Sequence, residues 1–376
     1  MIYDFMKSLT YLSLGISTLL LAAPVSKVRG APILPGDLVI YRVGDGSAAI
    51  GTTAAAVFLD EYTPLGVLVQ SIALPSSGAG QLTAVGNATT EGIISRSQDG
   101  SRLIFTGYSK AAGGTSPASD TYTITPRLIG TLSALGATDT STTVTSDNSI
   151  TTANTIRSAT SVDGTAYWVS TSSRVSYFGL GTGSSGTTVQ IDARNSRQVN
   201  LSGNVLFASN GSTSIANKVQ QYGPLPTGAT SPTAVVTLAT ADAVNGFALF
   251  DLSSSVAGDD TLYALSTVEN LLRKYTFDGT SWTSSGSISA GGAVNLTGVA
   301  IGPAVALYLT SGTTLSTETD SSGYNANITG AVTSLTTAGA NTAYRGIGMF
   351  AVPEPGTATL GLLGLVVLAV GRRARR

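Results

Sequence analysis

A chain of 376 residues with no cysteine and no histidine cannot form disulfide bonds, and it cannot build a Ser-His-Asp or Cys-His catalytic site. It also lacks the commonest zinc ligand. Seven of its basic residues and two of its acidic residues lie in the terminal segments 1–30 and 353–376, so the body between them is mildly acidic. The body therefore lacks the excess of basic residues that a nucleic-acid-binding surface needs.

The first 30 residues have the outline of a secretory signal peptide. Lys7 precedes an apolar run over residues 11–23, and smaller residues follow that run. A basic start, an apolar centre of this length and a small-residue cleavage site are the three parts of such a signal. Asp4 weakens the basic start. We expect cleavage before Ala31, and an uncleaved anchor is the alternative.

The body, residues 31–350, predicts an all-β domain. It is rich in Gly, Ser, Thr, Ala and Val, and its apolar runs are short, β-branched or aromatic. Gly, Asn, Asp and Ser bound these runs, as is typical of strands separated by turns. No amphipathic helix pattern stands out, and the length favours one large domain over several small ones.

A repeated hairpin is the main pattern of the body. An apolar strand, a tight turn and a second strand with an aromatic residue recur at a mean spacing of roughly 50 residues, in the range of propeller repeats. An Asp-Gly turn alone is ordinary hairpin chemistry, so the repetition carries the prediction. The five hairpins join residues 91–97 to 102–108, 157–162 to 165–170, 197–201 to 205–208, 246–252 to 261–266, and 296–301 to 305–310.

Two strand-like segments at opposite ends of the body lack a local partner. Residues 38–43 resemble a second strand, and residues 344–350 resemble a first strand. Their pairing gives a sixth hairpin and closes a ring without exposed sheet edges between the units. We therefore predict a six-bladed β-propeller. A seven-bladed ring is the main alternative because residues 109–155 could hold another blade, and a β-sandwich or β-solenoid is the alternative without a ring.

Three acidic segments could offer oxygen ligands to Ca²⁺: Asp45 between two glycines, Asp60 with Glu61, and Asp259 with Asp260. None has the spacing of a dedicated calcium loop, and solvated turns are the preferred explanation of all three. The sequence also gives no means of selecting a pair of carboxylates for glycoside hydrolysis. It therefore names no catalytic residue and no metal site, and calcium is the one cofactor left open.

Aromatic residues recur at equivalent places in the second strands. We expect them to pack between neighbouring blades rather than to bind sugar. Trp282 lies beside a predicted turn instead, and it is the candidate for stacking on a glycan. The recurring aromatic residues are Tyr41, Phe105, Tyr167, Trp168, Phe207, Tyr263 and Tyr308.

The last 24 residues contain a Pro-Glu-Pro triplet, a short apolar run and an arginine-rich end, in that order. A helix over residues 357–370 would reach about 21 Å, short of the roughly 30 Å hydrocarbon core. Such a transmembrane-type helix suits transient insertion, with the arginines as a stop signal on the cytoplasmic side. The triplet is Pro353, Glu354 and Pro355, and the arginines are Arg372, Arg373, Arg375 and Arg376.

This tail resembles the PEP-CTERM sorting signal of bacterial exported proteins. The resemblance implies that the Sec machinery exports the chain and that exosortase, a membrane protease-transpeptidase, recognises the triplet and removes the tail. It also implies a place in the envelope, exopolysaccharide or biofilm of a Gram-negative bacterium. An ordinary C-terminal anchor is the alternative. Residues 57–64 and 341–346 resemble uncharacterised propeller-like proteins that often carry this signal.

Two functions are compatible with these features. The first is a structural or adhesive protein of the envelope or extracellular matrix, which is not an enzyme and which contacts extracellular polysaccharide. The second is a calcium-dependent glycan-binding or glycan-cleaving propeller with carboxylates in a central channel. Carboxylates and asparagines directed into the channel would favour the second function, and an apolar or glycine-lined opening would favour the first.

Overall fold

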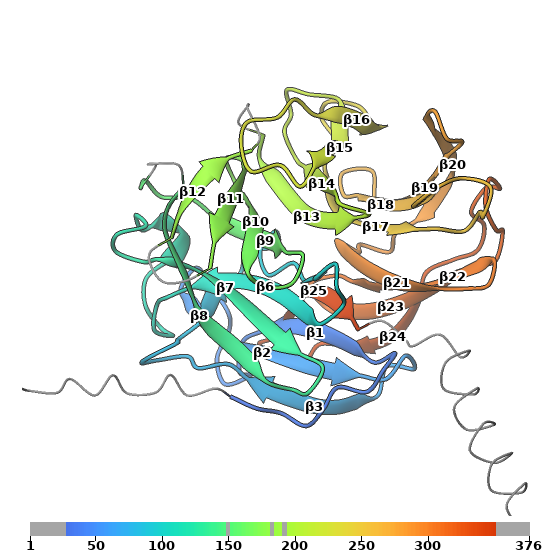
Figure 1. Ribbon diagram of the computed structural model, residues 1–376. Helices are drawn as coiled ribbons and strands as arrows, with labels where there is room; N and C mark the ends of the chain where they lie inside the picture. The colour runs from blue at the N-terminus through green and yellow to red at the C-terminus, as the bar shows by residue number, and fades with distance from the viewer. Residues whose placement is uncertain (1–27, 148–150, 181–183, 190–193, 351–376) are drawn as a thin grey trace, which may run out of the picture.

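The computed structural model describes residues 28–147, 151–180, 184–189 and 194–350 (Figure 1). Over these residues the chain forms strands and one 3-10 turn, η1 (Pro117–Ser119), which confirms the all-β prediction. No helix within them is long and apolar enough to cross a membrane. Residues 1–27 of the predicted signal peptide, the Pro-Glu-Pro triplet, the predicted tail helix and the terminal arginines lie outside the described residues.

Apart from β4 (Thr83–Val85), the described strands form six antiparallel groups of four, which we call units A to F. Unit A holds β25 (Ala343–Met349), β1 (Leu38–Val43), β2 (Ala54–Tyr62) and β3 (Leu68–Ala73). Unit B holds β5 (Ser95–Arg96), β6 (Arg102–Tyr108), β7 (Arg127–Ser133) and β8 (Thr138–Asp147). Unit C holds β9 (Ile156–Thr160), β10 (Ala166–Thr171), β11 (Val175–Gly179) and β12 (Ser184–Thr188).

The other three units follow the same order of strands. Unit D holds β13 (Ser196–Ser202), β14 (Val205–Asn210), β15 (Asn217–Pro224) and β16 (Thr233–Thr237). Unit E holds β17 (Val244–Phe250), β18 (Thr261–Ser266), β19 (Leu271–Phe277) and β20 (Trp282–Ser289). Unit F holds β21 (Asn295–Ile301), β22 (Ala304–Thr310), β23 (Thr314–Asp320) and β24 (Thr333–Thr337).

The first two strands of each unit are the hairpins that the sequence predicts. All five local hairpins are present, and β1 pairs with β25 from Leu38 opposite Met349 to Val43 opposite Ala343. The predicted pairing of the two ends of the body is therefore confirmed. The described part of residues 109–155 supplies η1, β7 and β8, and the two strands complete unit B.

Three of the units are also joined edge to edge. β4 (Thr83–Val85) pairs with β2 and with β6, and β12 pairs with β8 in parallel, so units A, B and C form one sheet of 13 strands. Units D, E and F are separate four-stranded sheets. The sequence carries no sign of these extra pairings, because no short turn connects the strands that make them.

Six apolar clusters fill the spaces between neighbouring units and close the ring. The recurring aromatic residues are at most 8% exposed, which confirms that they belong to the core. Figure 1 shows β25, β9, β13, β17 and β21, the first strands of five of the units, near the centre of the molecule. The clusters join A to B around Tyr41 and Phe105, B to C around Tyr108 and Tyr167, C to D around Trp168 and Val199, D to E around Phe207 and Phe247, E to F around Tyr263 and Leu307, and F to A around Tyr308 and Tyr344.

A repeated hydrogen bond links successive units near the ring centre. A hydroxyl at the end of a second strand donates to a carbonyl near the start of the next unit's first strand. Ser209 donates to the Asn245 carbonyl over 2.9 Å. Ser170 and Thr310 make the equivalent bonds to the carbonyls of Arg197 and Arg345. These bonds satisfy buried backbone acceptors that the sheets leave free.

The chain before β1 lies against the β7–β8 hairpin. The Gly30 N–H donates to the Gly136 carbonyl over 2.9 Å, and the Thr138 N–H donates to the Val28 carbonyl over 3.1 Å. Gly136 has a positive φ, and a Cβ there would lie 2.2 Å from the Ala31 carbonyl oxygen, so the contact requires glycine. Cleavage before Ala31 would remove both hydrogen bonds.

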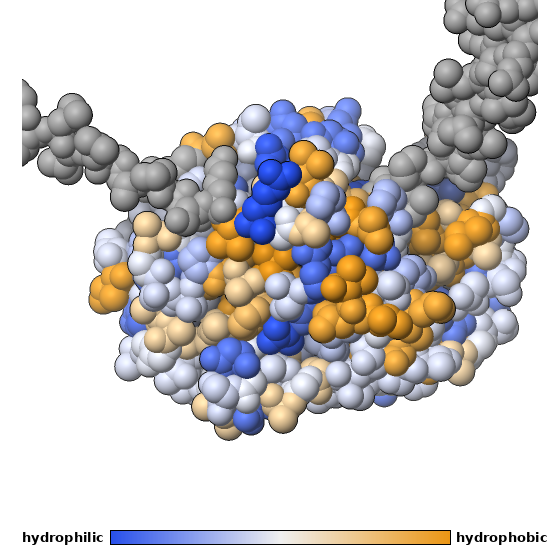
Figure 2. Space-filling view, turned by 90° about the horizontal axis from the view of Figure 1, so that it is seen from below, coloured by the Kyte–Doolittle hydropathy of each residue, from blue (hydrophilic) through white to orange (hydrophobic). Residues whose placement is uncertain are grey.

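The outer edge of unit A carries an apolar strip. Leu65, Val67, Leu68 and Val69 are 45–80% exposed. Among the described strands, β3 pairs only with β2, so its outer backbone groups are free of ladder bonds. Figure 2 shows the molecule from below, the side on which β3 lies, with apolar side chains gathered on the surface. Such an edge offers both backbone groups and apolar area to another surface.

Candidate functional site

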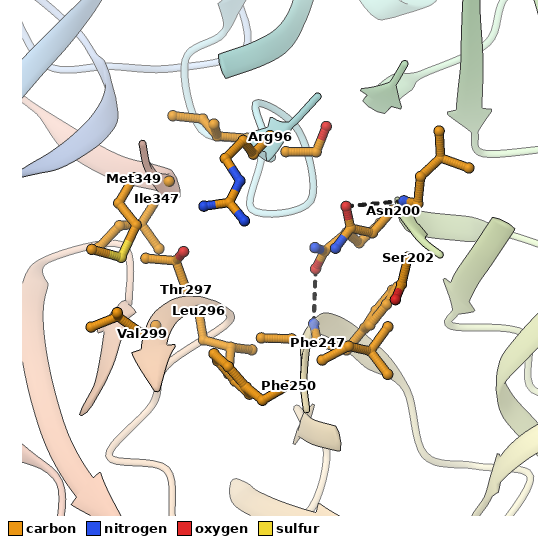
Figure 3. A pocket seen from close by; sticks show the side chains of 18 of the residues that line it. Arg96, Asn200, Ser202, Phe247, Phe250, Leu296, Thr297, Val299, Ile347 and Met349 are labelled. Carbon is orange, nitrogen blue, oxygen red and sulfur yellow. Dashed lines mark hydrogen bonds between the residues drawn. The ribbon is translucent and has the colours of Figure 1, made fainter. Parts of the chain in front are cut away.

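A pocket of about 440 Å³ lies at the centre of the ring, where the first strands of units A, B, D, E and F meet. β5, β13, β17, β21 and β25 supply its lining, together with Asp259 from the loop before β18. Figure 3 shows Arg96 and Asn200 on one part of the wall of this central pocket, and mainly apolar side chains, with Thr297 among them, on the rest.

Arg96 is the cation of the pocket lining. It ends β5, whose backbone pairs with Leu103 of β6, and its side chain reaches into the cavity (Figure 3). The turn that follows is held by Asp99, which accepts a hydrogen bond from the Ser101 N–H over 3.0 Å. The Arg96 guanidinium makes no hydrogen bond or ion pair with any described residue. The loss of solvent around it lowers its pKa, and the negative charge of Asp259 opposes this shift.

Two amides of β13 continue the polar wall. Gln198 and Asn200 lie two residues apart, so their side chains face the same side of the strand. The Gln198 Oε1 accepts from the Phe247 N–H over 2.8 Å, and the Asn200 Oδ1 accepts from the Leu201 N–H over 3.1 Å. These bonds fix the carbonyl ends of both amides, while their NH₂ groups have no partner among the described residues.

Asp259 is the one carboxylate among the lining residues. Burial raises its pKa, and the nearby Asp251 and Asp260 raise it further, whereas a hydrogen bond from Ser202 and the charge of Arg96 oppose the rise. The pocket therefore combines one guanidinium, one partly shielded carboxylate and three amides, and the third amide, Gln98, donates to the Asn204 Oδ1. Glycoside hydrolysis by two carboxyl groups would need a second carboxylate facing the first.

The rest of the wall is mainly apolar, with Thr297 of β21 as a polar residue within it. Leu296 and Val299 come from β21, and Ile347 and Met349 come from β25 (Figure 3). Phe250 of β17 lies beside them, and its ring packs edge-on against Tyr263, with 5.8 Å between the ring centres. This wall offers a dry surface to a ligand whose other side meets Arg96 and the amides.

The predicted candidates lie elsewhere. Trp282 begins β20 and is partly buried, with its ring centre 5.2 Å from that of Phe277. It does not line the central pocket, and its stacking on a glycan stays a prediction. The sorting residues lie outside the described part of the chain.

The carboxylates that the sequence offers to calcium already accept hydrogen bonds from the chain's own donors. In the described ranges, no three acidic side chains lie close enough together to hold a metal ion. Calcium binding stays a prediction. Asp60 accepts from Arg42 and Ser71, Glu61 from Leu34 and Gln70, Asp260 from Leu252 and Ser253, and Asp45 from Ser47.

Sequence reasoning missed Arg96, Gln198 and Asn200. Each stands on the first strand of a predicted hairpin, and first strands face the ring centre. Alignment of the hairpins by their turns would have shown polar residues at alternate positions of these strands, which is the signal for a polar channel wall.

Comparisons with known proteins bear on the tail rather than on the pocket. A family model described as the PEP-CTERM protein-sorting motif matches residues 351–376. The predicted sorting signal is thus confirmed. The motif indicates an exported protein of the envelope or surface of a Gram-negative bacterium, and it implies processing by exosortase. No curated protein matches the chain.

Three solved structures are similar to the chain at a low level. A putative 6-phosphogluconolactonase from Bacteroides uniformis has 13% identity and a TM-score of 0.41, over 80% of this chain and 99% of its own. The periplasmic gluconolactonase PpgL of Pseudomonas aeruginosa has 12% sequence identity and a TM-score of 0.44, over 84% of this chain and 100% of its own. A putative 6-phosphogluconolactonase from Bacteroides fragilis has 12% sequence identity and a TM-score of 0.45, over 83% of this chain and 98% of its own. Likeness at this level says nothing of activity.

Proposed function

We propose that this protein is a structural or adhesive component of the envelope or extracellular matrix, built on a six-bladed β-propeller, which binds extracellular polysaccharide without turning it over. The observation that carries the proposal is the ring itself. Units A to F pack through six apolar clusters, and the pairing of β1 with β25 joins the two ends of the body. A closed ring is a rigid platform with no free sheet edge between its units.

The lining of the central pocket supports binding rather than catalysis. It holds a single carboxylate, Asp259, beside a single guanidinium, Arg96, and an apolar wall. The chain has no histidine or cysteine to act as a base or nucleophile. The exposed apolar strip on β3 adds a second surface through which an adhesive protein could contact the matrix.

The test uses an exosortase-carrying Gram-negative host that secretes an acidic polysaccharide. The full chain and a variant with Pro353→Ala, Glu354→Ala and Pro355→Ala are expressed side by side. We expect the processed protein at the cell surface or in the matrix, and the variant retained in the membrane fraction. The recovered processed protein is then incubated with the polysaccharide. Binding without new reducing ends supports the proposal, whereas turnover of the polysaccharide or of an added sugar lactone refutes it.

A further inference from the structure

The guanidinium of Arg96 is a cation without a partner inside a cavity. The Arg96 side chain is exposed, so water solvates its charge, and a ligand that enters the pocket can take the place of that water. Arg96 is drawn into the central pocket, yet it makes no ion pair with Asp259 or with any other described residue. Its fork of N–H donors is therefore free for an anionic group that enters the pocket.

The other residues that line the pocket indicate the chemistry of the rest of the ligand. The NH₂ groups of Gln198 and Asn200 can donate to hydroxyl oxygens, and Asp259 can accept from a hydroxyl group. On the other side, Val299, Ile347 and Met349 offer an apolar surface (Figure 3). A pyranose ring has this division, because its hydroxyl groups point outward from an edge while its C–H groups form an apolar face. The volume of about 440 Å³ is ample for one such ring.

We infer that the central pocket binds a carboxylate-bearing sugar, such as a uronic acid residue of an acidic polysaccharide, with the Arg96 guanidinium as its anchor. The inference rests on the proposed polysaccharide-binding function and names its ligand. A guanidinium matches a carboxylate through two parallel N–H···O bonds. A phosphate dianion fits less well, because a single cation would face two charges with the Asp259 carboxylate close by.

The experiment is calorimetric titration of the processed protein at low salt with sodium D-glucuronate, D-glucose and inorganic phosphate. We expect glucuronate to bind about tenfold or more tightly than glucose, because a charge-assisted bidentate pair adds to the contacts that both sugars make. Arg96→Gln should abolish this preference, and Arg96→Lys should keep part of it, since lysine keeps the charge but not the fork. The preference should also weaken as salt is added.

Arg273→Gln is the matched control, because it removes an arginine from β19, where Arg273 pairs with Glu269 away from the pocket. It should leave the preference for glucuronate unchanged. Arg96→Gln should also keep the wild-type melting temperature, since Arg96 has no partner to lose. Equal affinity for glucuronate and glucose, no binding of either, tighter binding of phosphate, or a preference that survives in Arg96→Gln would each overturn the inference.

The inference and the proposed function fail separately. If the wild-type protein binds the host's acidic polysaccharide but shows no preference for glucuronate, the inference fails and the function stands. If glucuronate binds at Arg96 but the protein is not found at the cell surface or in the matrix, the assignment of the pocket stands and the function fails.

Discussion

Lys274 and Asp320 form a buried ion pair between units E and F. The Lys274 Nζ and the Asp320 Oδ2 are 2.8 Å apart, and the two side chains are 0% and 1% exposed. The Tyr263 hydroxyl donates to the same carboxylate over 2.6 Å, and the Ser322 N–H donates to it over 2.9 Å. The pair therefore ties β19 of one unit to the end of β23 of the next.

Asp320→Asn keeps the shape of the side chain but leaves the Lys274 ammonium buried without its counter-charge. Removal of one partner of a buried pair costs about 3–5 kcal/mol, a large fraction of the roughly 5–15 kcal/mol by which domains are stable. Urea unfolding of the processed protein, followed by the fluorescence of the chain's two tryptophans, measures this loss. Asp278→Asn is the control, since Asp278 is exposed and only caps a turn, and it should cost about 1 kcal/mol or less.

A double variant separates a stranded charge from a generally fragile site. Lys274→Met with Asp320→Asn removes both charges and keeps an acceptor for Tyr263 and Ser322, so it should recover most of the loss. The reasoning is wrong if Asp320→Asn costs less than about 1 kcal/mol, or if the double variant is no more stable than Asp320→Asn.

The same pair predicts a pH dependence. Burial raises the pKa of Asp320, but the hydrogen bonds from Lys274, Ser322 and Tyr263 outweigh it, so the pKa is lowered overall. A carboxyl group with a lowered pKa stabilises the fold above its unfolded value, about 3.9, and this contribution is lost as the pH falls through the folded value. The gap between wild type and Asp320→Asn should therefore narrow below about pH 4.

Three further predictions follow from other contacts. Burial raises the pKa of Glu91 from 4.5 to about 7. The wild type should therefore lose up to roughly 3 kcal/mol of stability relative to Glu91→Gln as the pH rises through that range. Urea midpoints of the two proteins that change in parallel with pH would contradict this. Gly346→Ala places a Cβ 2.2 Å from the Gly92 carbonyl oxygen, and it should lower the free energy of unfolding by about 1–3 kcal/mol or more. Gly312→Ala has open space around it and should lower the free energy of unfolding by less than about 1 kcal/mol. Equal melting temperatures of the two variants would contradict the close approach of units A and B. A chain that begins at Ala31 should melt a few degrees below one that begins at Val28, since it lacks two backbone hydrogen bonds, and identical thermal scans would show that these bonds contribute nothing.

The hairpins could be predicted because their signals are local. Turn residues such as Asp163 and Gly164 stand directly between two apolar strands, and the pairing of β1 with β25 followed from two segments that lacked local partners. The parallel contact of β12 with β8 could not be predicted, because no turn connects the two strands and their short runs of Ser and Thr fit many partners.

Buried charges were the least predictable part of the molecule. A lysine at position 274 is expected to face solvent, since charged residues are rarely buried without a partner. The partner of Lys274 lies on the next unit, so only the packing of units E and F brings Asp320 to it. Arg96 stays exposed, but it lines the central pocket only because five units meet there, which its neighbours in the chain do not indicate.

The most direct test of the account is a disulfide across the closing pair of strands. Val43 and Ala343 are paired residues of β1 and β25, and antiparallel partners lie about 4.5–5.5 Å apart, within reach of a disulfide bond. The chain has no cysteine of its own, and export exposes it to an oxidising compartment. In the exported Val43→Cys, Ala343→Cys protein, the ring predicts one intramolecular disulfide that links the N-terminal and C-terminal peptides in a mass spectrum of the digest. Free thiols at both positions, or disulfides only between molecules, would show that the two ends of the body do not meet.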